Sequence, residues 1–242
     1  MDFTYVGYLE LINLLKEKNY QFCNYFNYED YDKSVILRHD IDNLLNKALE
    51  MARLEYENNI ISTFFVLLST DFYNVFSKKS NKILKEIISL GHHIGLHFDG
   101  NKYEILNAKE LEYWVERESE ILGYAIDKEI KVVSMHRPSK WIVENNIQFE
   151  RIINSYSKKF LLDFKYLSDS RMHWREDVLG IIVNEKYNRL HILTHSFWYS
   201  HKNETINEKL MEFIDNAKIE QYYSLKDNIK DLDEIICKED IL

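Results

Sequence analysis

Five ionisable side chains follow short apolar runs at well-separated points of the sequence. Asp40, His97, His136, Asp169 and His195 each lie at or just past the end of a run typical of a buried strand. Ionisable groups at such positions cost free energy unless they are paired or bind a metal. Carboxylates and imidazoles also transfer protons and bind divalent metals. We therefore expect these residues to form one catalytic site.

The stretch 35–42 reads VILRHDID and carries two of the carboxylates. Its apolar start predicts a buried strand, and Asp40 and Asp42 follow at once. One interpretation is a site that uses both carboxylates. The structural alternative is that Asp42 is the N-cap of a helix predicted over 43–57.

The elements that must position these residues alternate along the chain. Strand-like runs are predicted over 35–37, 62–68, 93–97, 130–134, 164–167 and 190–193, and helices over 4–19, 43–57, 80–90, 107–122 and 141–156. This alternation predicts an α/β fold with a mainly parallel sheet. Active-site groups of α/β barrels gather at the carboxyl ends of the strands, which predicts a barrel-like enzyme. We expect a single domain over 1–242, with a motif-bearing core over 35–200 and a helical part over 204–232.

Composition and charge exclude some classes of function. The net charge of -9 argues against binding nucleic acid, which requires a basic surface. No apolar run reaches the roughly 18 residues needed to span a bilayer. The first twenty residues contain charged side chains and have no signal-peptide pattern, so we expect a cytoplasmic protein.

The ordered motifs resemble those of one family. They read RHDID (38–42), GHHIGLHFD (91–99), HRP (136–138), SDS (168–170) followed by Trp174, and THSFW (194–198). In this order they resemble the NodB-type polysaccharide deacetylases, in particular a divergent branch whose first motif is Arg-His-Asp-x-Asp. The resemblance implies a distorted, partly closed (β/α) barrel and a metal-dependent hydrolase that removes acetyl groups.

The resemblance also implies roles for individual residues. Asp40 corresponds to the general base and Arg137 to the arginine that orients it. Asp169 and His195 correspond to a carboxylate and the general-acid histidine that it tunes. Asp42 and His97 correspond to metal ligands. Residues expected to contact the substrate are His136, Trp174 and Trp198.

The second motif departs from the family pattern. The family's second metal histidine lies four residues after the first, and that position here is Asn101. His93 cannot replace it on a strand, because four residues span about 13 Å whereas ligand atoms lie within about 3.5 Å of each other. We expect Asp99, two residues past His97, to be the third ligand, with Asn101 and His136 as alternatives.

The resulting prediction is an enzyme with one divalent metal. Zinc is favoured, and an oxygen-rich site also suits manganese, iron or cobalt. The expected reaction is hydrolysis of an acetyl group from a sugar or glycan precursor in surface-polysaccharide synthesis. Two alternatives remain open: a metal amidohydrolase that acts on a small non-sugar amide, and a catalytically silent member that binds a glycan or a partner, motivated by Asn101.

Overall fold

The computed structural model describes residues 1–237, and the chain divides into two compact units, Met1–Tyr199 and Ser200–Leu242. The first unit contains the sheet and all predicted site residues. The described part of the second unit is mainly one helix, α7 (Ile206–Lys226), which begins with a capping box formed by Thr205 and Glu208. The single domain expected over 1–242 stays a prediction.

The first unit is built on one sheet in which every strand pair is parallel. The order is β6-β5-β4-β3-β2-β8-β7, and β1 pairs with the first half of β2. The sheet is a curled half-barrel with flanking helices, which confirms the predicted α/β class and the partly closed barrel. The strands are β1 (Gln21–Cys23), β2 (Ser34–Ile41), β3 (Thr63–Leu67), β4 (His93–Asp99), β5 (Val132–His136), β6 (Ile153–Asn154), β7 (Lys165–Ser168) and β8 (Arg189–Thr194).

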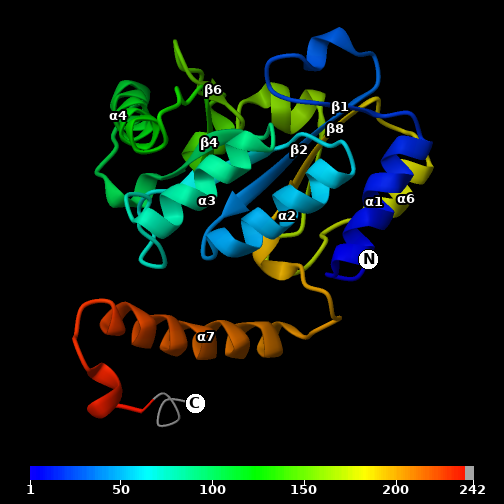
Figure 1. Cartoon of the computed structure of the whole chain (residues 1–242). Coiled ribbons are helices and arrows are strands. Elements are labelled where there is room, and N and C mark those ends of the chain that lie inside the picture. Colours follow the sequence, from blue (N-terminus) through cyan, green and yellow to red (C-terminus); the bar gives the residue numbers. More distant parts are fainter. Residues whose placement is uncertain (238–242) are drawn as a thin grey trace. The chain divides into compact units, whose positions relative to one another are not determined.

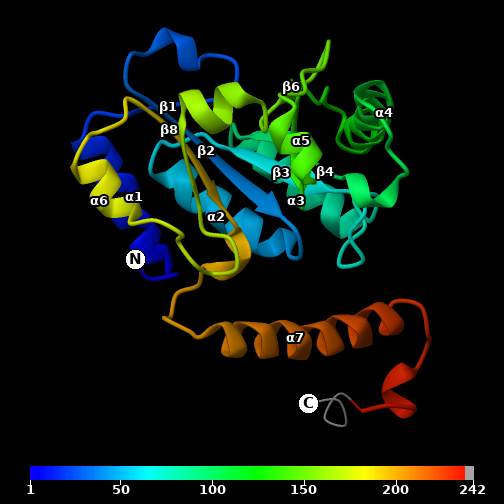
Figure 2. The ribbon, with the colours of Figure 1, turned by 180° about the vertical axis from the view of Figure 1, so that it is seen from behind.

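The first helix precedes β1, and the other helices of the first unit each connect two consecutive strands. They are α1 (Tyr5–Glu17), α2 (Leu45–Glu57), α3 (Lys78–Ser89), α4 (Ala108–Ile126), α5 (Lys140–Glu144) and α6 (Val178–Val183). In Figure 1, α2 and α3 lie in front of the sheet, and from behind β2 and β8 lie in front of α2 (Figure 2). These two helices therefore cover one face of the sheet.

The central strand β2 is buried along its whole length. Val35, Leu37 and Ile41 belong to the main core together with residues of α1 and α2. Ile36 packs in a second apolar cluster. Because side chains alternate along a strand, Arg38 and Asp40 point to the same face as Ile36.

The helix predicted over 141–156 is wrong. α5 ends at Glu144, and Ile153–Asn154 forms the short strand β6 instead. Asn145 is the C-cap of α5, and Asn146 has a left-handed φ of 46°. Asparagine tolerates this conformation, and it ends the helix early.

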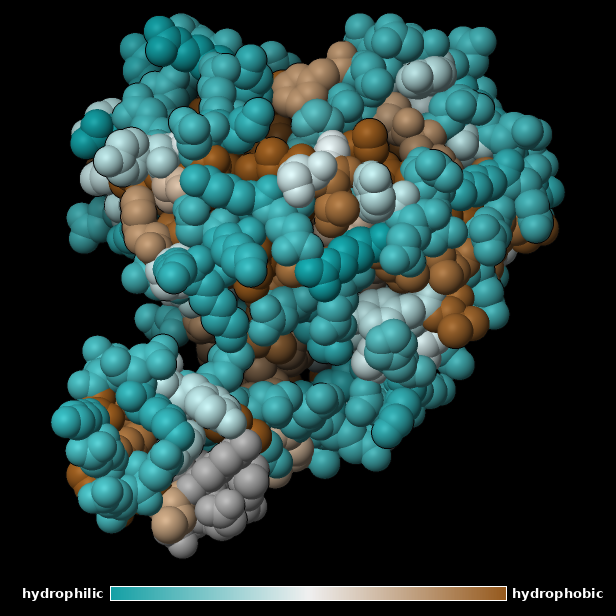
Figure 3. All heavy atoms as spheres, viewed as in Figure 1, coloured by the Kyte–Doolittle hydropathy of each residue, from teal (hydrophilic) through white to brown (hydrophobic). Residues whose placement is uncertain are grey.

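The face shown in Figure 3 is mainly polar, and a few charged side chains are buried. Hydrophilic residues cover most of the face seen in Figure 3. No helix in the described part of the chain is long and apolar enough to cross a membrane. Among the described residues, the buried Asp, Glu, Lys and Arg side chains are Arg38, Asp40, Glu55, Glu118, Asp169 and Lys209. Three of these, Arg38, Asp40 and Asp169, lie at or next to the predicted site.

Candidate active site

The predicted site residues meet at the carboxyl ends of the strands. Asp40 is the second-last residue of β2 and His136 the last of β5, whereas Asp169 and His195 directly follow β7 and β8. Figure 2 shows the arrowheads of β2 and β8 at the same end of the sheet. Asp40, His97, His136 and His195 line one cavity of about 980 Å³. The parallel sheet thus unites residues that are far apart in the sequence.

Asp42 lies directly after β2 and does not cap the next helix. The helix α2 begins at Leu45, and its N-cap is Leu44, which makes no side-chain hydrogen bond. The capping alternative for Asp42 is therefore wrong. Its carboxylate lies against two histidines from neighbouring strands.

Three ligand atoms form a compact triangle at the end of the sheet. Asp42 Oδ1 lies 3.2 Å from His97 Nε2 and 3.4 Å from His136 Nδ1. The two ring nitrogens are 3.2 Å apart. Ligand atoms bound to one tetrahedral zinc at about 2.0–2.1 Å lie roughly 3.4 Å from one another. The three edges of the triangle therefore match the spacing that a single metal ion requires.

The hydrogen bonds around His97 leave its Nε2 free to bind a metal. Ser134 Oγ donates to Asp40 Oδ1 at 3.3 Å and lies 2.6 Å from His97 Nδ1. Because a hydroxyl has one proton, Nδ1 of His97 must donate to Ser134, so Nε2 is the nitrogen that carries the lone pair when the ring is neutral, as a metal ligand must be. A metal ligand held by its other ring nitrogen in this way has a fixed tautomer and orientation.

Asp42 supplies a negative charge to the triangle. Its Oδ1 is buried and has no hydrogen bond of good geometry among the described residues. Burial would raise the pKa of Asp42, but His136 and His97 hold it well below its ordinary value. A buried carboxylate oxygen without a donor, facing two imidazole nitrogens, is a donor set that fits a divalent cation.

The structure does not bring Asp99 to this cluster. The strand β4 ends at Asp99, and a 3₁₀ turn, η2 (Gly100–Lys102), follows. The Asp99 carboxylate accepts a hydrogen bond of 3.0 Å from the backbone N–H of Asn101 and so caps this turn. The third nitrogen or oxygen donor of the triangle belongs to His136. This residue was predicted to contact the substrate, and it was one of the two alternatives to Asp99 as the third metal ligand. Asn101 is exposed in the turn.

Asp40 is paired with Arg38 and not with Arg137. Arg38 Nη2 lies 2.8 Å from Asp40 Oδ2, and the two side chains are 0% and 3% exposed. Arg137 is exposed on the cavity wall and makes no hydrogen bond to Asp40 among the described residues. The contact with Asp40 predicted for Arg137 is therefore made by Arg38, whose guanidinium also donates to Ser155 Oγ at 2.9 Å.

The charge of Asp40 depends on this pair. Burial would raise the pKa of Asp40, but Arg38, together with His97 and His195, holds it below its ordinary value. The guanidinium of Arg38 is itself held between aromatic rings, 5.2 Å from the centre of Phe65 and 5.0 Å from that of Tyr156. The Asp40 carboxylate is thus ionised and held in position by a fixed cation.

His195 and Asp169 form the predicted pair. His195 Nδ1 donates to Asp169 Oδ1 at 2.7 Å, and the His195 backbone N–H donates to the same carboxylate at 3.1 Å. Burial would lower the pKa of His195, but Asp169, with smaller contributions from Asp40 and Asp42, raises it to about 9. Its Nε2 lies 4.0 Å from Asp42 Oδ2, so the protonated nitrogen faces the cavity.

Two tryptophans complete the cavity wall. Trp174 and Trp198 both line it, as the sequence predicted for substrate contacts. Their indole nitrogens are buried and have no hydrogen-bond partner among the described residues. A buried N–H donor normally has a partner, so these two unpaired donors stand out at the cavity wall.

No protein-family model matches the sequence, and no curated protein matches it. Solved structures of similar shape include a CE4 family pseudoenzyme from Bacillus anthracis, at 14% identity and a TM-score of 0.42 over 76% of this chain. This chain covers 62% of that pseudoenzyme.

Two further solved structures are named as deacetylases. The polysaccharide deacetylase Bc1974 from Bacillus cereus is 14% identical, with a TM-score of 0.45 over 72% of this chain and 93% of that one. The chitin deacetylase from Colletotrichum lindemuthianum is 15% identical, with a TM-score of 0.45 over 75% of this chain and 81% of that one.

Proposed function

We propose that this chain is a metal-dependent hydrolase that removes an acetyl group from a sugar or glycan precursor in surface-polysaccharide synthesis. One observation carries the proposal. The Asp42–His97–His136 triangle, with edges of 3.2–3.4 Å, lies between an ionised carboxylate and a protonated histidine. A metal site flanked by a base and an acid suits hydrolysis of an acyl group.

The donor set favours zinc. Two imidazole nitrogens and one carboxylate oxygen are a common ligand set of catalytic zinc sites, which keep a further position for water. A divalent cation held by Asp42, His97 and His136 would act as a Lewis acid and lower the pKa of a bound water. The neighbouring residues Asp40 and His195 would accept and donate the protons of the reaction.

Asp40 is the proposed general base. Its Oδ2 lies 3.7 Å from His97 Nε2, next to the ligand triangle. Asp40 takes the proton of the water that attacks the acetyl carbon. Arg38 keeps the carboxylate ionised at neutral pH, which makes it ready to accept a proton but limits its basicity. Ser134 holds the other carboxylate oxygen.

His195 is the proposed general acid. The Nδ1–H group of His195 donates its hydrogen bond to Asp169, so the proton on Nε2 is the one that can be transferred to a molecule in the cavity. With a pKa of about 9, this imidazole is protonated at neutral pH. It gives its proton to the departing amine or alcohol as the bond to the acetyl carbon breaks.

The position of His136 argues against the catalytically silent alternative. It arose because Asn101 stands where the family has a metal histidine. His136 supplies the missing nitrogen from the neighbouring strand β5, so the triangle is complete without Asn101.

Acetate release tests the proposal. Purified protein is loaded with zinc and incubated with a panel of N- and O-acetylated sugars, their phosphorylated forms and small non-sugar amides. We expect acetate from at least one sugar and none from the Asp40→Asn variant. Release from the small amides alone would favour the non-sugar amidohydrolase. Equal release by wild type and Asp40→Asn would contradict the proposal.

A further inference from the structure

Three arginines line the cavity that contains the proposed site. They are Arg137, Arg171 and Arg175, and all three are exposed. Among the described residues, none of their side chains forms a hydrogen bond or an ion pair with the protein. Three guanidinium groups thus remain without a protein anion around one cavity.

Two of the three acidic residues that line the same cavity are paired with basic side chains. Asp40 is paired with Arg38, and Glu176 accepts two hydrogen bonds of 2.7 Å from Lys165. Asp42 belongs to the triangle with the two histidines. The positive charge at the cavity therefore has no partner, although the chain as a whole has a net charge of -9. A local field of the opposite sign to the net charge attracts an anionic ligand.

The backbone conformation around these arginines is unusual. Arg137 has a φ of 49°, and Arg171 and Met172 have φ values of 60° and 56°. Residues other than glycine adopt this left-handed region at a cost in free energy, and such residues cluster at ligand-binding sites. The strain at Arg137 and Arg171 gives a second reason, independent of charge, to assign these two arginines to a binding site.

We propose that the cavity binds an acetylated sugar that carries a phosphoryl group, with the phosphoryl oxygens at Arg137, Arg171 and Arg175. This inference rests on the proposed deacetylase function and names its substrate class. The planar guanidinium matches phosphate oxygens with two parallel hydrogen bonds. Three arginines exceed what one carboxylate requires, which favours a phosphate or diphosphate ester.

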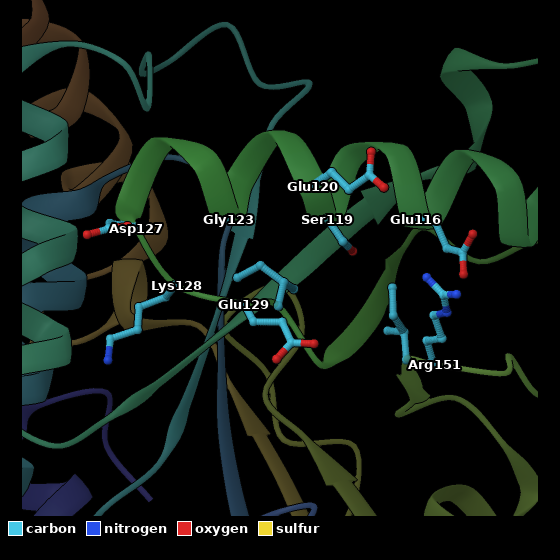
Figure 4. A pocket seen from close by; sticks show the side chains of 10 residues that line it. Glu116, Ser119, Glu120, Gly123, Asp127, Lys128, Glu129 and Arg151 are labelled. Carbon is cyan, nitrogen blue, oxygen red and sulfur yellow. The ribbon is translucent and has the colours of Figure 1, made fainter.

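A separate cavity provides a matched control. It has a volume of about 480 Å³ and lies beside α4. Figure 4 shows it lined by Glu116, Glu120 and Glu129 together with Arg151. Arg151 is exposed, like the other three arginines, but lies outside the proposed site. Arg151→Gln therefore removes an equivalent charge elsewhere on the same unit.

Binding of inorganic diphosphate tests the arginines without any turnover. Calorimetry is done on the full chain with a chelator present, so that no metal binds the probe. We expect Arg171→Gln and Arg175→Gln each to weaken binding about tenfold and Arg151→Gln to leave it unchanged. Affinity should also fall as salt concentration rises. Absence of binding at millimolar diphosphate, or equal binding by all four proteins, would overturn the inference.

Kinetic measurements then distinguish which kind of phosphorylated sugar the cavity recognises. The ratio of kcat/KM for a phosphorylated acetyl sugar to that for the neutral sugar is measured with a sugar 1-phosphate and with a nucleoside-diphosphate sugar. We expect a ratio above about ten for one of them, reduced by Arg171→Gln and Arg175→Gln but not by Arg151→Gln. Acetate release without preference for either would contradict this inference alone. Arginine-dependent diphosphate binding without acetate release from any sugar would contradict the deacetylase function instead.

Discussion

Arg38 and Asp40 project from the same face of β2, and the guanidinium lies 2.8 Å from the carboxylate with both side chains buried. The spacing of two residues on a strand makes this contact local, so the strand that supplies the proposed base also supplies the cation that keeps it ionised. A buried pair of this kind has a consequence for stability, because removing one partner leaves the other as an uncompensated charge.

Removing Arg38 alone should therefore destabilise the protein strongly. We expect Arg38→Gln to lower the free energy of unfolding by about 3–5 kcal/mol. The Arg38→Gln/Asp40→Asn double variant should recover part of this loss, because no buried charge is then left unpaired. Urea unfolding followed by tryptophan fluorescence measures both. Arg137→Gln is the control and should change stability by less than about 0.5 kcal/mol, and strictly additive losses in the double variant would refute the coupling.

The two carboxylates of the RHDID motif, Asp40 and Asp42, have different proposed roles that substitutions should distinguish. Asp40→Asn should keep its metal and lose turnover by about 10²–10⁴-fold, because it removes the base alone. Asp42→Ala should lose the metal itself, because it removes a ligand of the triangle. Elemental analysis beside acetate release distinguishes the two. Equal loss of metal in both variants would show that their roles are wrongly assigned.

The third ligand can be tested with a pair of matched variants. We expect His136→Gln to fall below about a tenth of an equivalent of zinc after dialysis, because one of three ligands is gone. Asp99→Asn should keep about one equivalent, since Asp99 only caps the turn after β4. Metal loss in Asp99→Asn with retention in His136→Gln would reverse the assignment.

The His195–Asp169 pair predicts a dependence of stability on pH. The folded-state pKa of His195 is raised from about 6.5 to about 9, so the stabilisation is fully present below pH 6.5 and is lost as pH rises toward 9. With a chelator present, the free energy of unfolding of the wild type should fall over this range. Asp169→Asn should flatten this fall, whereas Asp99→Asn should retain it. A slope that Asp169→Asn leaves unchanged would refute the contribution of this pair.

Much of the site could be predicted because it rests on local pattern. The apolar runs that end in Asp40, His97, His136 and His195 marked strand ends, and a parallel sheet places such ends together. The pair of His195 and Asp169 followed from the same rule and the resemblance. These features depend on strand order and direction, which alternation of strand and helix largely determines.

The site residues and strands that were predicted wrongly or missed depend on features that a local sequence pattern does not show. Asp99 was preferred on the assumption that β4 continues, but the turn after β4 redirects its carboxylate to the backbone. Arg38 was missed because the resemblance pointed to Arg137, although the two-residue spacing to Asp40 on a strand was a signal that could have found it. The strands β1 and β6 have three and two residues, too few for a periodic pattern.

The central claim is that hydrolysis depends on a metal held by Asp42, His97 and His136. The most direct test is acetate release by chelator-treated protein as zinc is added back. Activity should rise from baseline and saturate at about one equivalent of zinc, and His136→Gln should need a large excess to respond. Acetate release that is already maximal in the chelated wild type, or that responds identically in His136→Gln, would contradict the account.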